Sequence, residues 1–312
     1  MNHLLLTIGI VLPLFLVMLT GQAAMRFKLV RQQDLSSIDR LIFRVFLPCS
    51  IVRSILQADV SMGFQWPVVW FFIFYQLSAV GLGMLIIPRL FKEPGDRGVL
   101  VQNTFRCNYT LFGFALAESL YPVGDGGVAA MLVALTVPFF NVLSIIVFES
   151  YGEGRSSLAG VFKKMLRNPL LWACLVGLTL RLLPISMPEA LVSAISKLGG
   201  IASPLALFSI GASIRFSGVT SNRKAFGFGL LCRLVVVPAI YLPLAYVLGL
   251  RGPAFAGLLC AIASPAAVSS YSMAKELGGN DRLAAQLVAF TTTFSAISLF
   301  VLIYLGKSIG IF

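Results

Sequence analysis

The residues best suited to chemistry lie in two polar interruptions of otherwise apolar stretches. One reads Gln-Asn-Thr-Phe-Arg-Cys-Asn-Tyr-Thr over 102–110, and the other reads Ala-Ser-Pro-Ala-Ala-Val-Ser-Ser-Tyr over 263–271. Asn108 can cap backbone groups, and Pro265 removes a backbone donor and clashes with the preceding turn, so both predict a broken helix. Half-helix N-termini at such breaks carry partial positive charge and free N–H groups, which favours binding of an anion such as a carboxylate.

The residues that we expect to bind substrate around these breaks are Asn108, Arg106, Thr110, Ser264, Pro265, Ser269 and Ser270. The breaks themselves are assigned to Asn108 and Pro265. The alternative is that Pro265 only kinks a helix and that Asn108 makes an interhelical hydrogen bond. The hydroxyls of Thr110, Ser269 and Ser270 either contact substrate or satisfy the broken backbone.

The arginines inside apolar stretches have competing interpretations. A bare guanidinium at mid-depth is unfavourable, and the fork of Arg106 can clamp a second carboxylate, which would favour dicarboxylates. Alternatively, Arg106 extends to the cytoplasmic surface or contacts Glu118 or a backbone carbonyl. Arg44 and Arg233 lie about seven residues from the cytoplasmic ends of their stretches, within reach of the surface, and we interpret both as interfacial.

Enzyme chemistry is poorly supported by the ionisable residues. His3 is the only histidine, so no histidine-based triad or metal cluster is expected. Of the 12 acidic residues, only Glu118 sits well inside an apolar stretch and Glu276 at the end of one, so no carboxylate pair is available for acid–base work. Glu118 is either a titrating coupling site or a solvated end residue. The five cysteines lack CxxC spacing and glycine-rich phosphate loops are missing, so we predict no metal, no cofactor and no enzyme.

The elements that must position these residues are membrane spans. The chain is 58% hydrophobic and 12% charged with a mean hydropathy of +0.92, against the roughly 45–50% apolar and about 25% charged residues of soluble domains. The stretches long enough to cross a bilayer, which requires roughly 20 apolar residues each, are 4–24, 37–57, 66–88, 98–121, 126–148, 168–184, 189–214, 226–249, 253–277 and 282–305. The predicted fold class is therefore an all-α integral membrane protein, multi-pass, with ten transmembrane helices in one membrane domain.

The basic residues orient these spans. If the N-terminus lies outside, sixteen Lys and Arg face the cytoplasm and only Arg181, Lys197, Arg251 and Lys307 face outward. This positive-inside bias predicts that both termini lie outside and that the net charge of +12 meets anionic membrane lipids rather than nucleic acid. Basic residues follow the first stretch instead of preceding it, which favours an uncleaved span over a signal peptide.

The chain also repeats itself at an offset of about 156 residues. Pro13 pairs with Pro169, and Pro48 pairs with Pro204, each exactly 156 positions apart, and Asn108 falls on Pro265 at 157. Each of the latter two lies about ten residues, or roughly 15 Å, into its span. The pattern divides the chain into a first five-helix repeat (1–150), a cytoplasmic linker (151–167) and a second repeat (168–312). Because each repeat holds an odd number of spans, the repeats are inverted, which is typical of secondary transporters.

Four segments together resemble the auxin efflux carrier family, which includes plant auxin carriers and bacterial permeases for malate and malonate. These segments are Asn-Tyr-Thr-Leu-Phe-Gly at 108–113, Arg-Asn-Pro at 167–169, Ser-Pro-Leu-Ala-Leu-Phe-Ser-Ile-Gly at 203–211, and 265–276. The resemblance implies two inverted five-helix repeats with crossed, broken helices 4 and 9, a sodium/proton-antiporter-like fold. It implies a scaffold part, a transport part and a homodimer through the scaffold half. It also implies that the substrate carboxylate binds where Asn108 and Pro265 mark the crossing.

This sequence departs from the plant members in three places. The long central loop is replaced by the short linker, Leu170 stands where they carry a second asparagine, and the stretch 66–88 lacks their charged pair. These departures disfavour auxin itself. The resemblance to the bacterial permeases then implies a small organic acid as substrate and location in the bacterial inner membrane.

We therefore predict a secondary transporter that moves a small organic anion, a mono- or dicarboxylate, by alternating access. Uniport, H⁺ symport and Na⁺ symport stay open. The alternatives are a sodium-coupled organic-anion symporter of the bile-acid type and a non-transporting membrane sensor of a ligand.

Overall fold

The computed structural model describes residues 2–57, 65–120, 127–151, 166, 169–183, 187–213 and 222–311. Within these ranges the chain is almost entirely helical. The helices in chain order are α1 (Asn2–Arg26), α2 (Gln32–Leu41), the π-helical turn η1 (Ile42–Phe46), α3 (Leu47–Gln57), α4 (Trp66–Leu90), α5 (Pro94–Phe105), the π-helical turn η2 (Tyr109–Gly113), α6 (Phe114–Leu120), α7 (Gly127–Tyr151), α9 (Pro169–Leu182), α10 (Glu189–Ser213), α11 (Arg223–Leu231), the π-helical turn η4 (Cys232–Val236), α12 (Val237–Val247), α13 (Gly252–Ala263), α14 (Ser269–Glu276) and α15 (Asp281–Ser308).

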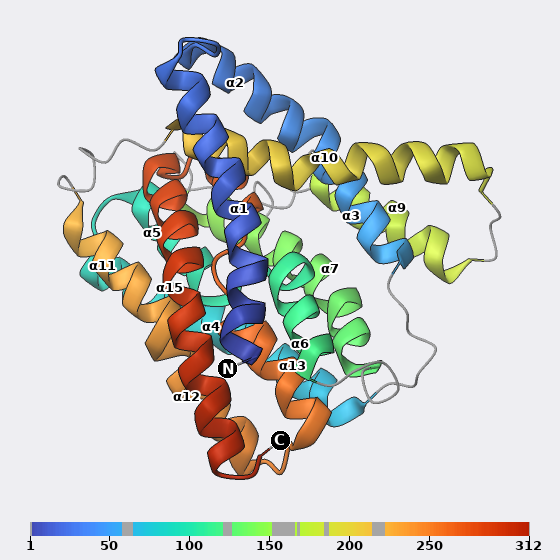
Figure 1. Cartoon of the computed structure of the whole chain (residues 1–312), viewed down its shortest axis with the longest axis vertical. Helices are drawn as coiled ribbons and strands as arrows, with labels where there is room; N and C mark the ends of the chain where they lie inside the picture. The colour runs from blue at the N-terminus through green and yellow to red at the C-terminus, as the bar shows by residue number, and fades with distance from the viewer. Residues whose placement is uncertain are drawn as a thin grey trace.

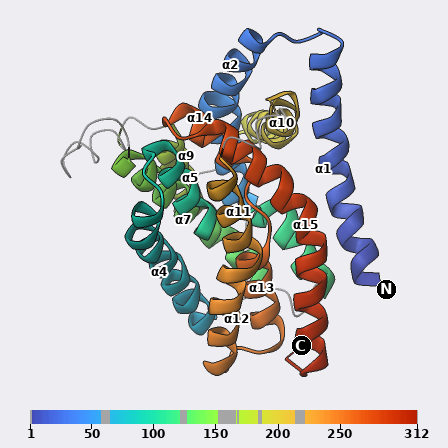
Figure 2. The same ribbon diagram turned by 90° about the vertical axis from the view of Figure 1, so that its left-hand side faces the viewer.

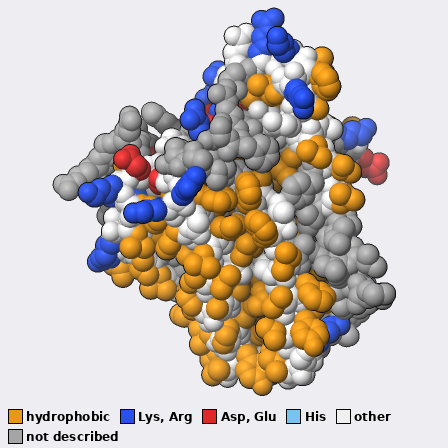
Figure 3. All heavy atoms as spheres, turned by 60° about the vertical axis from the view of Figure 1, so that its left-hand side comes forward, with side chains coloured by type: hydrophobic (Ala, Val, Ile, Leu, Met, Phe, Trp, Pro, Cys, Tyr) orange, Lys and Arg blue, Asp and Glu red, His pale blue; other side chains and the backbone are white. Residues whose placement is uncertain are grey.

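Several helices have the length and composition of membrane spans. The described helices that qualify are Trp66–Leu90, Met131–Tyr151, Glu189–Ala212 and Arg223–Val247, and the pair Asp281–Ser295 and Ile297–Ser308, bent by 42°, qualifies as a fifth span if taken together. Each coincides with one of the ten stretches expected from the sequence. Hydrophobic side chains cover much of the face in Figure 3, whereas Lys and Arg gather mainly toward one end. The chain is therefore a multi-pass integral membrane protein.

The helices pack in two groups. The first, which we call the α10 group, comprises α1, α2, η1, α3, α9 and α10; α10 contacts α1, α2 and α3, and α3 contacts α9. The second, the α5 group, comprises α4 to α7 and α11 to α15 with their π-helical turns. Figures 1 and 2 show the two groups side by side, with α10 passing behind α1.

Close approach of two backbones fixes the contact between α1 and α10. A Cβ added at Gly21 would lie 2.0 Å from the Phe208 carbonyl oxygen, and one added at Gly211 would lie 1.9 Å from the Met18 carbonyl oxygen. Small residues permit such contacts between membrane helices. Replacement of either glycine would force the two helices apart.

The α5 group is joined at one end by a carboxylate and two amides. Asp96, in the first turn of α5, accepts hydrogen bonds from the Asn222 side chain at 2.5 Å and from the Asn280 side chain at 2.7 Å. Asn280 also caps α15 by accepting the Leu283 N–H at 3.0 Å, and the left-handed Gly278 (φ +78°) separates α14 from α15. The starts of α5, α11 and α15 are thus held together.

Candidate functional site

The helical hydrogen bonding of the chain stops between α5 and η2. Arg106 is extended (φ −88°, ψ 118°), and Asn108 has φ −83° and ψ 57°. Helical bonding resumes when the Phe112 and Gly113 N–H groups donate to the Asn108 carbonyl at 3.0 and 3.2 Å. Gly113 is required here, because a Cβ at this position would lie 2.8 Å from the Ser264 hydroxyl and 2.6 Å from the Tyr109 ring.

A second interruption separates α13 from α14. Ser264 is extended (φ −60°, ψ 151°), as expected for a residue before proline. The two extended segments lie antiparallel, with a bridge between Cys107 and Ala266, and the Asn108 N–H donates to the Pro265 carbonyl at 2.8 Å. The two residues that the repeat offset paired are therefore in direct contact.

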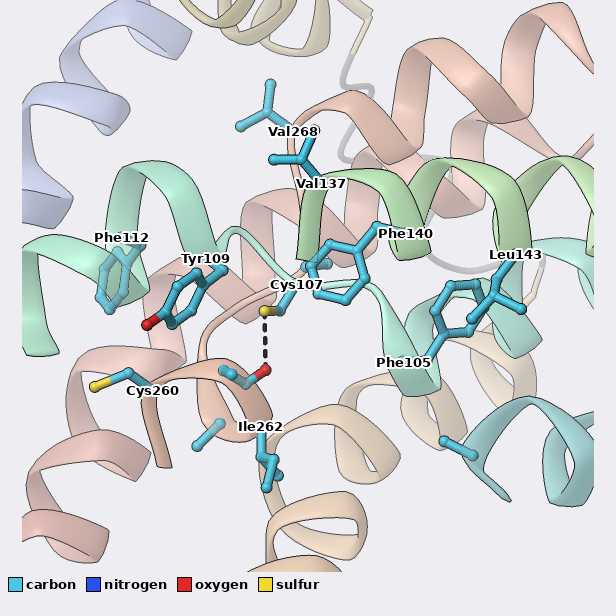
Figure 4. Close-up of a cluster of buried hydrophobic side chains, with 14 of the residues drawn as sticks. Phe105, Cys107, Tyr109, Phe112, Val137, Phe140, Leu143, Cys260, Ile262 and Val268 are labelled. Carbon is cyan, nitrogen blue, oxygen red and sulfur yellow. Dashed lines mark hydrogen bonds between the residues drawn. The ribbon is translucent and has the colours of Figure 1, made fainter. Parts of the chain in front are cut away.

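Apolar side chains surround the two extended segments. Figure 4 shows Phe105 and Leu143 on one side of the Cys107 segment and Tyr109 and Phe112 on the other. The Cys107 thiol donates to the Ala261 carbonyl at 3.0 Å, the contact drawn as a dashed line. In this apolar setting each backbone group that the breaks release needs a partner within the protein.

Arg233 donates hydrogen bonds to several of the backbone carbonyls that the breaks release. Its Nε donates to the Ser264 carbonyl at 2.8 Å, its Nη2 to the Ile262 carbonyl at 2.8 Å and its Nη1 to the Thr104 carbonyl at 3.4 Å. The residue has no exposed surface. The interpretation of Arg233 as interfacial is therefore wrong: carbonyls released by the breaks offset the cost of burying the guanidinium. Arg44, by contrast, is exposed.

Tyr75 on α4 and Thr291 on α15 also hydrogen-bond backbone groups at the breaks. The Tyr75 hydroxyl lies 3.2 Å from the Thr104 carbonyl and 3.4 Å from the Phe105 carbonyl, and the Ala266 N–H donates to the Thr291 hydroxyl at 3.0 Å. We call Arg233 and Tyr75, together with the carbonyls that they hold, the carbonyl side of the breaks.

Arg106 makes contacts of a different kind. Its Nη1 donates to the Asn141 side-chain oxygen at 3.3 Å and to the Ser144 hydroxyl at 3.2 Å, and its Nη2 donates to Asn141 at 3.2 Å and to the Ser269 hydroxyl at 2.7 Å. Arg106 is only 5% exposed, so it does not extend to the cytoplasmic surface. Each of these partners is a neutral side chain, so no counter-charge for Arg106 lies among the residues that the structure describes.

Several polar atoms near Arg106 lack a partner. Nδ2 of Asn108, Nε of Arg106 and the Ser270 hydroxyl are buried without a hydrogen bond to any residue that the structure describes. Asn108 does not cap η2 with its side chain, so the expectation that its side chain caps the break is wrong. A buried polar atom without a partner calls for a physical explanation, and a bound ligand is one.

A cavity of about 100 Å³ lies beside Arg106. The residues that line it are Leu47, Ser50, Ile51, Arg106, Cys107, Asn108, Tyr109, Val137, Phe140, Asn141, Ala202, Ser203, Ala206, Ala267, Val268 and Ser269. Those on α3 and α10 belong to the α10 group and the rest to the α5 group, so the cavity lies between the two groups. Arg106 is charged and no carboxylate is among these lining residues. We call Arg106 and Asn108 the cavity side of the breaks.

The candidate residues divide between the cavity and the breaks. Arg106, Asn108 and Ser269 line the cavity, whereas Ser264, Pro265 and Ser270 are not among its lining residues. The Ser264 hydroxyl donates to the Cys260 carbonyl at 2.5 Å, within its own helix.

Other expected features lie outside the described residues. Nothing is described of the side chains of Thr110 and Glu118, and Arg167 and Asn168 are outside the described ranges, as is the linker apart from Tyr151 and Leu166.

The sequence interpretation missed three polar residues. Asn141 and Ser144, spaced i and i+3 on α7, face Arg106; two polar residues at helical spacing within the stretch 126–148 were the available signal. Asp39 is fully buried, although it lies near the start of the stretch 37–57, where we expected no buried acid.

A charged cavity between two groups of apolar helices is typical of membrane transporters. The chain belongs to the family described as "Membrane transport protein", whose model matches residues 6–303. The resemblance to auxin efflux carriers is thereby confirmed.

Similar proteins come from archaea and a plant. An uncharacterized transporter of Methanothermobacter thermautotrophicus is 23% identical over 93% of this chain and 95% of its own length. An uncharacterized transporter of Methanocaldococcus jannaschii is 22% identical over 92% of this chain and 94% of its own. Auxin efflux carrier component 1 of Arabidopsis thaliana is 30% identical over 44% of this chain, but that match covers only 23% of the plant protein.

Proposed function

We propose that this chain is a secondary carrier that moves a small organic anion with one or two carboxylates across the membrane by alternating access. The observation that carries the proposal is the cavity lined by Arg106 and Asn108 between the two helix groups. Membership of a transporter family supports the class. The nature of the cargo is argued from the charge and donors of the cavity.

The charge of Arg106 favours an anion. A buried guanidinium without a counter-charge is unfavourable, and a carboxylate that enters the cavity supplies one. Nε of Arg106 and Nδ2 of Asn108 are buried donors without partners, and a carboxylate can accept from both. Arginine presents donors in a planar fork that matches a carboxylate, so a second carboxylate of a dicarboxylic acid suits Arg106.

The size of the cavity favours a small substrate. A cavity needs roughly 10–15 Å³ to hold one water molecule. A cavity of about 100 Å³ therefore accommodates several water-sized groups. Pockets for drug-sized ligands run from about 300 Å³ upward. A short organic acid is therefore a better match than an indole acid in this conformation.

The division into two helix groups supports alternating access. A cavity between two bodies that slide against each other can open first to one side of the membrane and then to the other. We propose further features with this mechanism: ten spans in two inverted repeats, the crossing of the broken helices, and both termini outside. We also propose a homodimer through the scaffold half, which we assign to the α10 group, and residence in a bacterial inner membrane.

Substrate counterflow in proteoliposomes tests the proposal. Labelled malate, malonate, succinate and an indole acid are each offered below saturation to the native protein, to Asn108→Ala and to Arg106→Gln. Counterflow needs no driving force, so it reports transport whatever the coupling ion is. We expect saturable exchange of one of the small acids, reduced in both variants. Sodium dependence of net uptake separates a sodium symporter from the other carriers.

The matched control is Arg44→Gln. Arg44 is an exposed arginine in a π-helical turn, so the same substitution there leaves exchange unchanged. Native protein that is folded and monodisperse but exchanges none of the acids would overturn the carrier proposal and favour a sensor. Exchange that is equal in the native protein and in both cavity variants would place the site elsewhere.

A further inference from the structure

A buried carboxylate lies where α14 meets the α10 group. Asp39 on α2 accepts hydrogen bonds from the Ser209 hydroxyl at 2.6 Å, the Tyr271 hydroxyl at 3.2 Å and the Lys275 ammonium at 2.5 Å. Ser209 belongs to α10, and Tyr271 and Lys275 belong to α14. Figure 2 shows α14 beside α2 and α10. One carboxylate therefore joins three helices and both helix groups.

The surroundings of Asp39 contain few titratable groups. Lys275 and Tyr271 contact it from α14, and α10 contributes the neutral hydroxyl of Ser209. On its own helix the neighbouring Arg40 is exposed. The Asp39 side chain is 0% exposed and that of Lys275 is 21% exposed. Lys275 is thus the member of the cluster whose side chain reaches the protein surface.

The carboxylate cluster and the cavity share the same helices. Ser269, the first residue of α14, accepts the hydrogen bond of Arg106, and Lys275 follows six residues later, about 9 Å along the helix at roughly 1.5 Å per residue. On α10, Ala206 lines the cavity and Ser209 follows one turn later. A displacement of α14 against α10 that opens the cavity therefore also separates the groups around Asp39.

We propose that Asp39 is the protonation site that couples anion transport to a proton, an inference that rests on the proposed carrier function. While Asp39 is charged, Lys275 holds α14 against α2 and α10. Separating the pair would leave a buried carboxylate without its counter-ion, which is strongly unfavourable. A proton on Asp39 removes that charge and releases Lys275 to water, so α14 can move. The proton enters with the anion and leaves Asp39 when the ion pair forms again.

Asp39→Asn tests the coupling, because the amide keeps the shape of the side chain and an acceptor oxygen but cannot exchange a proton. Proteoliposomes report two quantities with labelled malonate, malate and succinate: counterflow without a gradient, and accumulation driven by a proton gradient with the acid side outside. We expect the native protein to do both. Asp39→Asn keeps counterflow and loses the accumulation. Asp34→Asn, at an exposed acid on the same helix, behaves as the native protein does.

Lys275→Gln tests the same coupling through the other member of the ion pair. It leaves Asp39 charged and without its counter-ion, so transport falls at neutral pH and recovers as the pH is lowered and Asp39 binds a proton. The double variant Asp39→Asn/Lys275→Gln removes both charges and follows Asp39→Asn. It also guards against misfolding caused by one unpaired charge.

Specific results would overturn the inference. They are accumulation in Asp39→Asn equal to that of the native protein, no recovery of Lys275→Gln at low pH, and loss of counterflow in both Asp39→Asn and the double variant. Native protein that shows counterflow but ignores a proton gradient also overturns it, while the carrier function stands. Absence of counterflow in the native protein is a different result, which contradicts the carrier function itself.

Discussion

Arg106 and Arg233 are both buried at the same pair of helix breaks, yet they hold different partners. Arg233 donates to three backbone carbonyls and has no exposed surface. Arg106 donates to the side chains of Asn141, Ser144 and Ser269, keeps one buried donor without a partner, and lines a cavity. The first guanidinium completes the backbone, and the second is available to a ligand.

The difference shows how a buried arginine can be assigned a role. Carbonyls at a helix break are fixed by the fold and cannot leave, so Arg233 has no freedom to exchange them for a ligand. Hydroxyl and amide side chains can rotate, so Arg106 can exchange part of its hydrogen bonding for a carboxylate. Substitutions on the carbonyl side should therefore change stability, and those on the cavity side should change affinity.

The largest effect is expected from Arg233→Gln. Glutamine cannot reach all three carbonyls, and each buried carbonyl without a donor costs roughly 1–3 kcal/mol, so the free energy of unfolding falls by about 3 kcal/mol or more. Thermal unfolding of the detergent-solubilised protein and its yield as a monodisperse species measure the loss. Arg44→Gln, the exposed control, leaves both unchanged. If Arg233→Gln were as stable as the native protein, Arg233 would not be needed to complete the backbone, and its contrast with Arg106 would not hold.

Arg106→Gln is expected to act on affinity instead. A hydrogen bond to a charged group contributes roughly 1.5–3 kcal/mol, so the half-saturation concentration for a dicarboxylate rises by about 10- to 100-fold, at about 1.4 kcal/mol per factor of ten. Stability changes little, since the variant removes a buried charge that has no counter-ion among the described residues. Counterflow across a series of substrates measures the half-saturation concentration. Arg106→Lys keeps the charge without the planar fork, so its half-saturation concentration should lie between those of the native protein and Arg106→Gln. Unchanged dicarboxylate affinity would contradict the hypothesis that Arg106 binds a second carboxylate.

Asn108→Ala is expected to have a smaller effect on the same side. Its amide is a neutral donor group, so the variant loses about 1 kcal/mol of binding, which corresponds to a roughly fivefold rise in the half-saturation concentration. Nδ2 of Asn108 makes no hydrogen bond to any described residue, so the thermal stability of the variant should match that of the native protein. A marked loss of stability in this variant would mean that the amide supports the fold and not the ligand.

The sequence predicts the breaks better than their surroundings. Asn108 and Pro265 were paired by the repeat offset alone, and the structure joins them through a backbone hydrogen bond. At Pro265 this works because helix breaking is a local property of proline. At Asn108 the break lies where it was expected, although the side chain makes no cap hydrogen bond. The spans α4, α7 and α10 could also be predicted from the sequence, since a span requires a continuous run of hydrophobic residues.

The partners of buried charges could not be read in the same way. Arg233 was placed by its distance from the end of its stretch, and Asp39 was not singled out at all. Position along a stretch says nothing about the carbonyls or ammonium groups that other helices bring to a residue. Asn141 and Ser144 give a weak signal for the same reason, because two polar residues on a helix face do not identify what they face. Such contacts depend on tertiary packing across more than 30 residues of chain, between α5 and α7 or between α2 and α14.

Tyr75→Phe gives the smallest expected effect and sharpens the comparison most directly. It removes only the hydroxyl that donates to the Thr104 and Phe105 carbonyls, and Arg233 still reaches Thr104. The free energy of unfolding should fall by about 1 kcal/mol, seen as a small decrease in the unfolding temperature. The half-saturation for substrate should stay unchanged, because Tyr75 does not line the cavity. A change in affinity without a change in stability would show that the two sides of the breaks are not separate, since a residue of the carbonyl side would then act on the ligand.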